Sequence, residues 1–326
     1  MRRTPLPPSV GTLMLVLLLS GCAPADSSAQ PGTHAGEASD LPVVLASFSV
    51  LEDMASAVGG DRVDTRSITP PGAEVHEYSP TPGDLRDTAE ADLILFNGLG
   101  LEAWYEQFLT HTSAEVFMVS EGVQTLPVTR LPGSSDPAGE NAEDPEREGL
   151  PVNPHAWMSP AQAMTYVDNI EAALSELSPE DADIFAKNAE DYRGEIRRIW
   201  QEAAEALEPL QAEGQVHLVS CEGAFSYLAQ DLGLSEHYLW PLNAEDQGSP
   251  QQVEAQIRYV SENQVPAVFC ESTVNDAAQQ QVAESTDAQL SDPLHVDSIT
   301  EADGPAPSYL ELLQHDLDLI IEGAQR

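Results

Sequence analysis

Residues 43–69 read VVLASFSVLEDMASAVGGDRVDTRSIT, and this stretch indicates the class of fold. Its first six residues are mostly apolar and favour a strand, residues 49–58 favour a helix that ends at two glycines, and residues 63–69 predict a second strand. A strand, a helix and a strand in this order are typical of a parallel sheet with a covering helix, because parallel strands need a long crossover connection.

The same alternation continues through both halves of the chain. We predict further strands at residues 92–96, 116–119, 217–220, 237–240, 267–270 and 294–297. Predicted helices cover residues 82–89, 101–109, 160–177, 224–232, 250–263, 277–285 and 309–322. The pattern predicts an α/β protein in which helices cover parallel sheets.

A long helical segment lies between the two halves. Ser178 is a predicted N-cap and Pro179 a first helical residue, and apolar side chains follow at helical spacing as far as about residue 207, before Pro209. At 1.5 Å per residue this helix would be roughly 45 Å long. Because that is longer than a usual crossover helix, we interpret it as a strut between two lobes.

The N-terminus has the features of an export signal. The apolar run at residues 12–19 is shorter than the about 20 residues that span a bilayer, and it ends in LSGC (19–22), which resembles a bacterial lipobox. We expect a signal peptide at residues 1–21, a lipid on Cys22 and a flexible tether over residues 22–40. An ordinary signal peptide with a chance cysteine is the alternative.

The charge of the chain is strongly acidic. Thirteen Lys and Arg stand against 55 Asp and Glu, for a net charge of −42, and Lys187 is the one lysine. This balance excludes a nucleic-acid-binding protein, since phosphate contacts need basic clusters. An acidic surface could concentrate cations near a cleft, but we favour a solvated surface that is adapted to high salt.

Two cysteines remain if Cys22 carries the lipid. Cys221 and Cys270 each close a predicted strand. Strands of one parallel sheet bring such ends together, and export permits oxidation, so one hypothesis is a disulfide between the two cysteines. The alternative hypothesis is two buried thiols.

Four side chains that can ligate a metal lie where strands or loops end. They are His76, His155, Glu222 and Asp297, two from each half of the chain. In open α/β sheets the ligand site lies beyond the carboxyl ends of the strands. A cleft between two lobes would bring the four together.

Four segments with these side chains resemble the metal-binding solute-binding proteins of ABC transporters, the manganese, iron and zinc cluster. They are VHEYSPTPGDL (75–85), NPHAWMSP (153–160), CEGAFSYLAQDLGL (221–234) and VDSITEADGPAPSYLELLQHDLDLI (296–320). The resemblance extends from about Leu41 to the C-terminus. It implies that the four candidate side chains are the metal ligands.

The resemblance also implies two Rossmann-like lobes, each a parallel sheet flanked by helices, joined by one long rigid helix. We therefore expect an N-terminal lobe at residues 41–177, a linking helix at 178–211 and a C-terminal lobe at 212–326. An acidic insertion at residues 131–152 interrupts the first lobe.

Manganese is the metal that the residues favour, with zinc and iron as alternatives. Carboxylate oxygen suits Mn²⁺, whereas zinc prefers sulfur- and nitrogen-rich tetrahedral sets. Zinc-type relatives tend to have histidine at the position of Glu222 and a histidine-rich insertion, and residues 131–152 contain no histidine. Zn²⁺ nevertheless binds more tightly than Mn²⁺ to a given site, so affinity alone does not select manganese.

The expected role is a binding protein and not an enzyme. The resemblance implies an ABC permease with its ATPase as partner; we expect a monomer that contacts the membrane through its lipid alone. The rival classes are an exported metallohydrolase and a surface adhesin, but the chain has no HExxH pair and no GxSxG elbow.

The remaining histidines are expected to be structural or exposed: His34, His111, His217, His237, His295 and His315. Of these, His295 could support Asp297 from two residues away, on the same face of a predicted strand. Tyr78 and Trp157 are expected to pack rather than to bind.

Overall fold

The computed structural model describes residues 41–110, 112–128, 151–242 and 248–326. The expected signal peptide, Cys22, the tether and nearly all of the acidic insertion lie outside the described residues. Within these ranges, no helix combines the length and the apolar character needed to cross a membrane.

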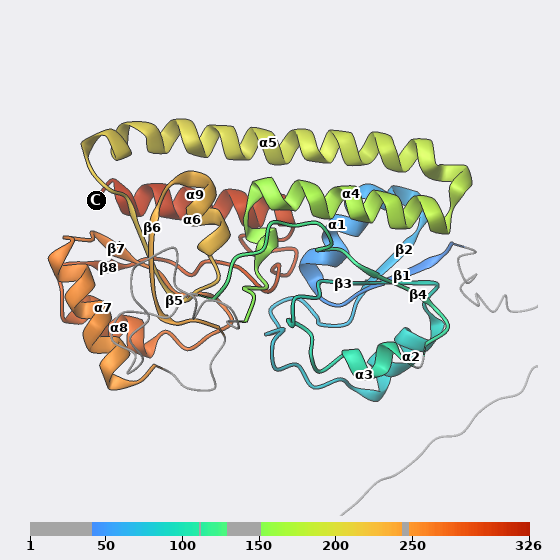
Figure 1. Cartoon of the computed structure of the whole chain (residues 1–326), viewed down its shortest axis with the longest axis horizontal. Helices are drawn as coiled ribbons and strands as arrows, with labels where there is room; N and C mark the ends of the chain where they lie inside the picture. The colour runs from blue at the N-terminus through green and yellow to red at the C-terminus, as the bar shows by residue number, and fades with distance from the viewer. Residues whose placement is uncertain (1–40, 111, 129–150, 243–247) are drawn as a thin grey trace, which may run out of the picture. The chain divides into compact units, whose positions relative to one another are not determined.

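The N-terminal half contains a four-stranded parallel sheet in the order β2-β1-β3-β4 (Figure 1). Its strands are β1 (Val43–Ala46), β2 (Asp64–Ser67), β3 (Leu93–Phe96) and β4 (Glu115–Met118). The two central strands, β1 and β3, are largely buried, as expected for a sheet that helices cover on both faces. All four carboxyl ends therefore lie along one edge of the sheet.

Helices cover both faces of this sheet. They are α1 (Ser49–Gly59), α2 (Pro82–Glu90), α3 (Glu106–Leu109) and α4 (Pro160–Leu177). In Figure 1, α1 and α4 lie on one side of the sheet and α2 and α3 on the other. α1 ends as predicted at two glycines: Gly60 has a φ of 59°, which is strained for residues with a Cβ.

The predicted helix at residues 101–109 is mostly a loop, and only α3 is helical. Residues 98–100 all have positive φ, which interrupts regular structure before it can start. The Glu102 carboxylate then accepts hydrogen bonds from the backbone N–H groups of Asn97 and Gly98 at 2.7 and 3.1 Å. These bonds favour a tight loop over a helical turn.

The long helix α5 (Ala182–Glu213) begins after a 3₁₀ turn at Pro179–Asp181 and continues past Pro209. The prediction that it ends before Pro209 is wrong. A proline inside a helix removes one backbone hydrogen bond, but Leu207 is fully buried and Leu210 packs against the same core, so packing maintains the helix. α5 contacts α1 and α4 of the N-terminal half and α9 (Tyr309–Ala324) of the C-terminal half (Figure 1).

The C-terminal half has two parallel strand pairs. β5 (His217–Glu222) pairs with β6 (Ser235–Trp240), and β7 (Ala267–Val268) pairs with β8 (Gln289–Leu290). A hydrogen bond of 2.8 Å from the N–H of Phe269 to the carbonyl of Val219 links the two pairs.

The remaining helices of this half are α6 (Ser226–Leu232), α7 (Pro250–Glu262) and α8 (Ala277–Glu284). In Figure 1, α7 and α8 lie on one side of the strands and α9 on the other. The α/β fold with parallel sheets flanked by helices is confirmed.

The predicted strand at residues 294–297 does not form. Leu294 makes one isolated bridge with Glu271. The next N–H, that of His295, donates to the side chain of Asp316 in α9 at 2.9 Å instead of to a strand. Asp297 therefore lies in a loop, and the alternation that would place His295 on its face is absent.

One hydrophobic cluster extends through both halves and includes Val44 of β1, Ile196 of α5 and Leu312 of α9. The described residues belong to one compact unit. The lobe boundaries at residues 177 and 211 stay a prediction.

Candidate metal centre

The four candidate ligands come from four separate places in the chain. His76 lies in the loop between β2 and α2, and His155 stands directly before a 3₁₀ turn at Ala156–Met158. Glu222 is the last residue of β5, and Asp297 follows the Leu294 bridge. The last three are almost completely buried, whereas the His76 side chain is 13% exposed.

The ligand atoms of these side chains converge. The Nε2 atoms of His76 and His155 are 3.1 Å apart. Oε1 of Glu222 lies 3.7 and 3.8 Å from these two nitrogens, and Oδ1 of Asp297 lies 4.0 and 3.7 Å from them. Atoms that share one metal ion at about 2.1 Å lie about 3–4 Å from each other, so the spacing of each carboxylate oxygen from the two imidazole nitrogens fits a single ion. The ligand atoms of His76, His155 and Asp297 all lie within 4.8 Å of one another, whereas Glu222 is close to both imidazoles but does not belong to this group.

Burial favours the neutral form of both imidazoles. Burial lowers the pKa of His76 and of His155, and the proximity of the two rings lowers that of His155 further. Neutral imidazole is the form that donates a lone pair to a metal.

The carboxylate of Asp297 is in an unfavourable environment without a cation. Burial raises its pKa, and the negative charges of Glu74 and Glu271 raise it further. Its buried Oδ1 has no hydrogen-bond partner among the residues that the structure describes. A buried polar atom without a partner costs free energy, and a cation beside it would remove that cost.

Trp157 packs between two of the loops that carry proposed ligands, which agrees with the packing role expected for it. Its indole N–H donates to the carbonyl of Val296 at 3.0 Å, beside Asp297. Its ring also lies against those of Phe48 and His155, with centroids 5.0 and 5.2 Å away.

Sequence reasoning missed Glu271, which lies beside the site. Its carboxylate oxygens accept from the backbone N–H of Glu222 at 3.2 and 3.3 Å. Burial raises the pKa of Glu271 to about 8. A signal was present, because Glu271 follows Cys270 at a strand end as Glu222 follows Cys221.

Cys221 and Cys270 are joined by a disulfide in the structure, with Cα atoms 4.9 Å apart. Both are buried, in the hydrophobic cluster between β5 and α7. This arrangement agrees with the hypothesis of a disulfide. The redox state of the two cysteines in the exported protein stays a prediction.

The other described histidines lie outside the cluster. His237 bonds to Gln256 and stacks on Tyr259, and Nδ1 of His295 contacts the hydroxyl of Ser272 at 2.9 Å. Burial and the neighbouring His315 lower the pKa of His295 to about 4. His34 and His111 lie outside the described residues.

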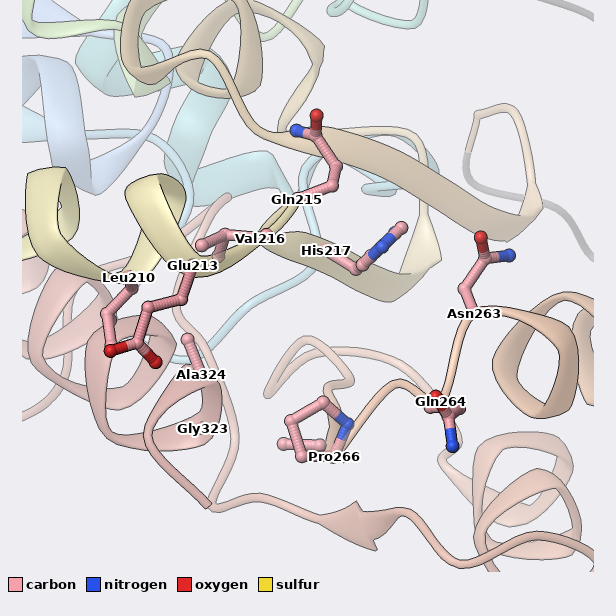
Figure 2. A pocket seen from close by; sticks show the side chains of 12 residues that line it. Leu210, Glu213, Gln215, Val216, His217, Asn263, Gln264, Pro266, Gly323 and Ala324 are labelled. Atoms are coloured by element: carbon pink, nitrogen blue, oxygen red, sulfur yellow. The ribbon is translucent and has the colours of Figure 1, made fainter.

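A pocket of about 240 Å³ occurs at the opposite end of β5, where His217 lies with Asn263 and Gln264 (Figure 2). The imidazole of His217 is 2.8 Å from the hydroxyl of Tyr259. No metal-binding group of three side chains was found there among the described residues. The pocket is therefore separate from the candidate ligands.

Comparison with known proteins identifies the family of the chain. The profile of the ZnuA family, described as the zinc-uptake complex component A, periplasmic, matches residues 44–323. The iron-binding protein YfeA of Yersinia pestis is 42% identical over 281 residues, which cover 86% of this chain and 85% of YfeA. The manganese ABC transporter substrate-binding lipoprotein PsaA of Streptococcus anginosus is 30% identical and covers 97% of this chain and 99% of its own.

A solved structure agrees with these sequence matches. The Mn-bound periplasmic metal-binding protein from Candidatus Liberibacter asiaticus is 34% identical, with a TM-score of 0.77 over 87% of this chain and 99% of its own. The resemblance that the four motifs indicated is thus confirmed. The chain belongs to the ZnuA family of periplasmic metal-binding, solute-binding proteins of ABC transporters.

Proposed function

We propose that this chain captures Mn²⁺ outside the cytoplasm with four ligands: His76, His155, Glu222 and Asp297. One observation carries the proposal. Segments far apart in the sequence place two imidazole nitrogens 3.1 Å apart, and a carboxylate oxygen from each of two acids lies within 4.0 Å of both.

The donor set supports manganese by its chemistry. Two imidazoles and two carboxylates offer two nitrogens and up to four oxygens, and oxygen-rich sites suit Mn²⁺. Two carboxylate charges also balance a divalent cation, which matters at a site this buried. Because Zn²⁺ lies above Mn²⁺ in the general order of affinity, selection would depend on geometry or on the supply of metal.

Iron and zinc are the competing cargoes. The relative that is 42% identical is named as an iron-binding protein, and the family description names zinc. The protein named for manganese is 30% identical. The measurement of affinity must therefore include all three metals.

Capture requires no bond to be made or broken in a substrate. The buried ligands would replace water around the ion, and an ABC permease would receive it. The relatives named as ABC transporter substrate-binding lipoproteins support this route and the lipid on Cys22. We accordingly place the protein on the outer face of the cell membrane.

The direct test titrates metal-stripped protein separately with Mn²⁺, Fe²⁺ under anaerobic conditions and Zn²⁺. We expect one Mn²⁺ per chain. Loss of a residue that only supports a metal ligand weakens metal binding about 10–100-fold. Glu222→Ala and His155→Gln each remove a proposed ligand, so each should weaken Mn²⁺ binding by more than that. His237→Gln is the matched control, since His237 is also buried but lies outside the cluster.

Wild-type Mn²⁺ affinity in the Glu222→Ala variant would refute the ligand set. Elemental analysis of protein from its native membrane identifies the cargo, and zinc or iron at one per chain would replace manganese in the proposal. Normal growth of a deletion strain at limiting metal would contradict the transport role.

A further inference from the structure

Asn153 links a ligand-bearing loop of the N-terminal half to one of the C-terminal half. The side chain is buried, with 1% of the residue exposed. Its Oδ1 accepts from the backbone N–H of His155 at 3.1 Å, and its Nδ2 donates to the carbonyl of Gly223 at 2.6 Å. Gly223 directly follows Glu222, so one amide contacts the segments of two proposed ligands.

The orientation of this amide follows from the polarity of its backbone partners. The N–H of His155 can only donate, and the carbonyl of Gly223 can only accept. A flipped amide would place its NH₂ group against the N–H of His155 and its oxygen against the carbonyl of Gly223. The oxygen of Asn153 must therefore face His155.

The same oxygen lies 2.8 Å from Nδ1 of the His155 ring. Because an amide oxygen only accepts, the proton of the neutral ring must reside on Nδ1. Nε2 then carries the lone pair, and Nε2 is the atom that lies 3.1 Å from His76 and 3.7 Å from Asp297. In the other tautomer an N–H group would point at the place of the ion.

We propose that Asn153 is the positioning residue of the metal centre: it holds His155 in the Nδ1–H tautomer and keeps this ligand in register with the Glu222–Gly223 segment. The proposal extends the proposed function, since it assumes that His155 is a ligand.

Further contacts hold Asn153 itself in place. Its backbone carbonyl accepts from the hydroxyl of Tyr227 at 2.7 Å. Its Nδ2 also lies 3.3 Å from the hydroxyl of Ser226, and that hydroxyl donates to the buried carboxylate of Glu236 at 2.7 Å. The hydrogen bonds run in one direction, from the amide through Ser226 to Glu236, so they reinforce the same amide orientation.

The first test reads the tautomer in the metal-free wild-type protein, by ¹⁵N NMR of labelled histidine at neutral pH. The His155 signal is assigned by its loss in His155→Gln. We expect a protonated Nδ1 and an unprotonated Nε2. A protonated Nε2 would overturn the proposal.

The second test compares Asn153→Leu with Asn169→Leu. Asn169 of α4 also donates through Nδ2 to two backbone carbonyls, those of Val119 and Glu121 at 2.8 Å each, but it lies outside the site. We expect Asn153→Leu to shift His155 toward the Nε2–H tautomer and to weaken Mn²⁺ binding about 10–100-fold. Asn169→Leu should leave both unchanged.

An unchanged tautomer in Asn153→Leu, or an equal loss of affinity in Asn169→Leu, would contradict the positioning role. The outcomes also separate this proposal from the proposed function. If the wild-type protein has the Nδ1–H tautomer but binds no Mn²⁺, the proposed cargo is wrong while the tautomer assignment stands.

Discussion

Glu102 determines the shape of the loop that follows β3. Its Oε1 accepts from the hydroxyl of Ser47 at 2.6 Å and from the N–H of Asn97, and its Oε2 accepts from the N–H of Gly98. Burial raises the pKa of Glu102 to about 7, although these hydrogen bonds oppose the shift. Asn97 in turn donates to the carbonyl of Pro154 at 3.1 Å, beside His155, so the loop supports the metal centre.

We predict that Glu102→Gln destabilises the protein by about 1–3 kcal/mol, the cost of a buried donor without a partner. A glutamine has one acceptor oxygen, so its NH₂ group would face one of the N–H donors that the carboxylate now satisfies. Urea denaturation above pH 7 measures the change in the free energy of unfolding. The control is Glu106→Gln in α3, where the side chain is exposed, and an equal effect in both variants would contradict the prediction.

At the scale of elements, the ends of helices and strands depart most from what the sequence predicts. α4 has the predicted bounds, because Ser159 and Pro160 start it with local signals. α5 continues past Pro209, and residues 294–297 form no strand, since packing on the core and a hydrogen bond to Asp316 decide these cases. Local propensity contains no information about partners that are remote in the sequence.

Asp53 of α1 accepts hydrogen bonds that connect elements of the two halves. Its Oδ2 accepts from the N–H of Tyr309 at 2.8 Å, at the start of α9, and from the hydroxyl of Tyr192 in α5 at 3.4 Å. Burial raises the pKa of Asp53 to about 6, and the negative charges of Glu52 and Glu311 add to the shift.

The raised pKa of Asp53 makes the stability of the fold depend on pH. Because the pKa of Asp53 is raised in the folded state, folding favours its protonated form, and the resulting stabilisation is complete below the unfolded pKa of about 3.9. It is lost as the pH rises through about 6. Asp53→Asn cannot titrate but keeps an acceptor oxygen for Tyr309.

We therefore expect the difference in unfolding free energy between the wild type and Asp53→Asn to change from about pH 4 to pH 6 and to level off above it. Chemical denaturation over this range provides the measurement, with the exposed Asp61→Asn as control. If the difference in unfolding free energy is the same at both ends of this pH range, the pKa of Asp53 is not raised in the folded state.

For the whole molecule, the net charge of −42 is the dominant electrostatic property. Local ion pairs such as Lys187–Asp191 and Arg198–Glu202 occur on α5, but exposed pairs contribute little. Repulsion among the excess carboxylates therefore opposes folding, and salt screens it over a Debye length that falls from about 10 Å at 0.1 M to about 3 Å at 1 M.

We predict that the melting temperature rises between low and molar NaCl. Differential scanning calorimetry of metal-free protein measures it, and a neutral osmolyte at matched osmolarity separates screening from a general solute effect. A melting temperature that does not rise with salt would refute the interpretation of the acidic surface as salt-adapted.

The sequence by itself determined the class of fold and the four candidate ligands. Strand and helix periodicity is local, and His76, His155, Glu222 and Asp297 stand in short motifs beside predicted strands or loops. The tertiary structure alone decided that a carboxylate oxygen of Glu222 and one of Asp297 each lie within 4.0 Å of both imidazole nitrogens, and that Glu271 and Asn153 contact the ligand segments. The Glu222–Glu271 contact joins residues 49 positions apart, and the Asn153–Gly223 contact joins the two halves, so both depend on tertiary packing, which no local pattern encodes.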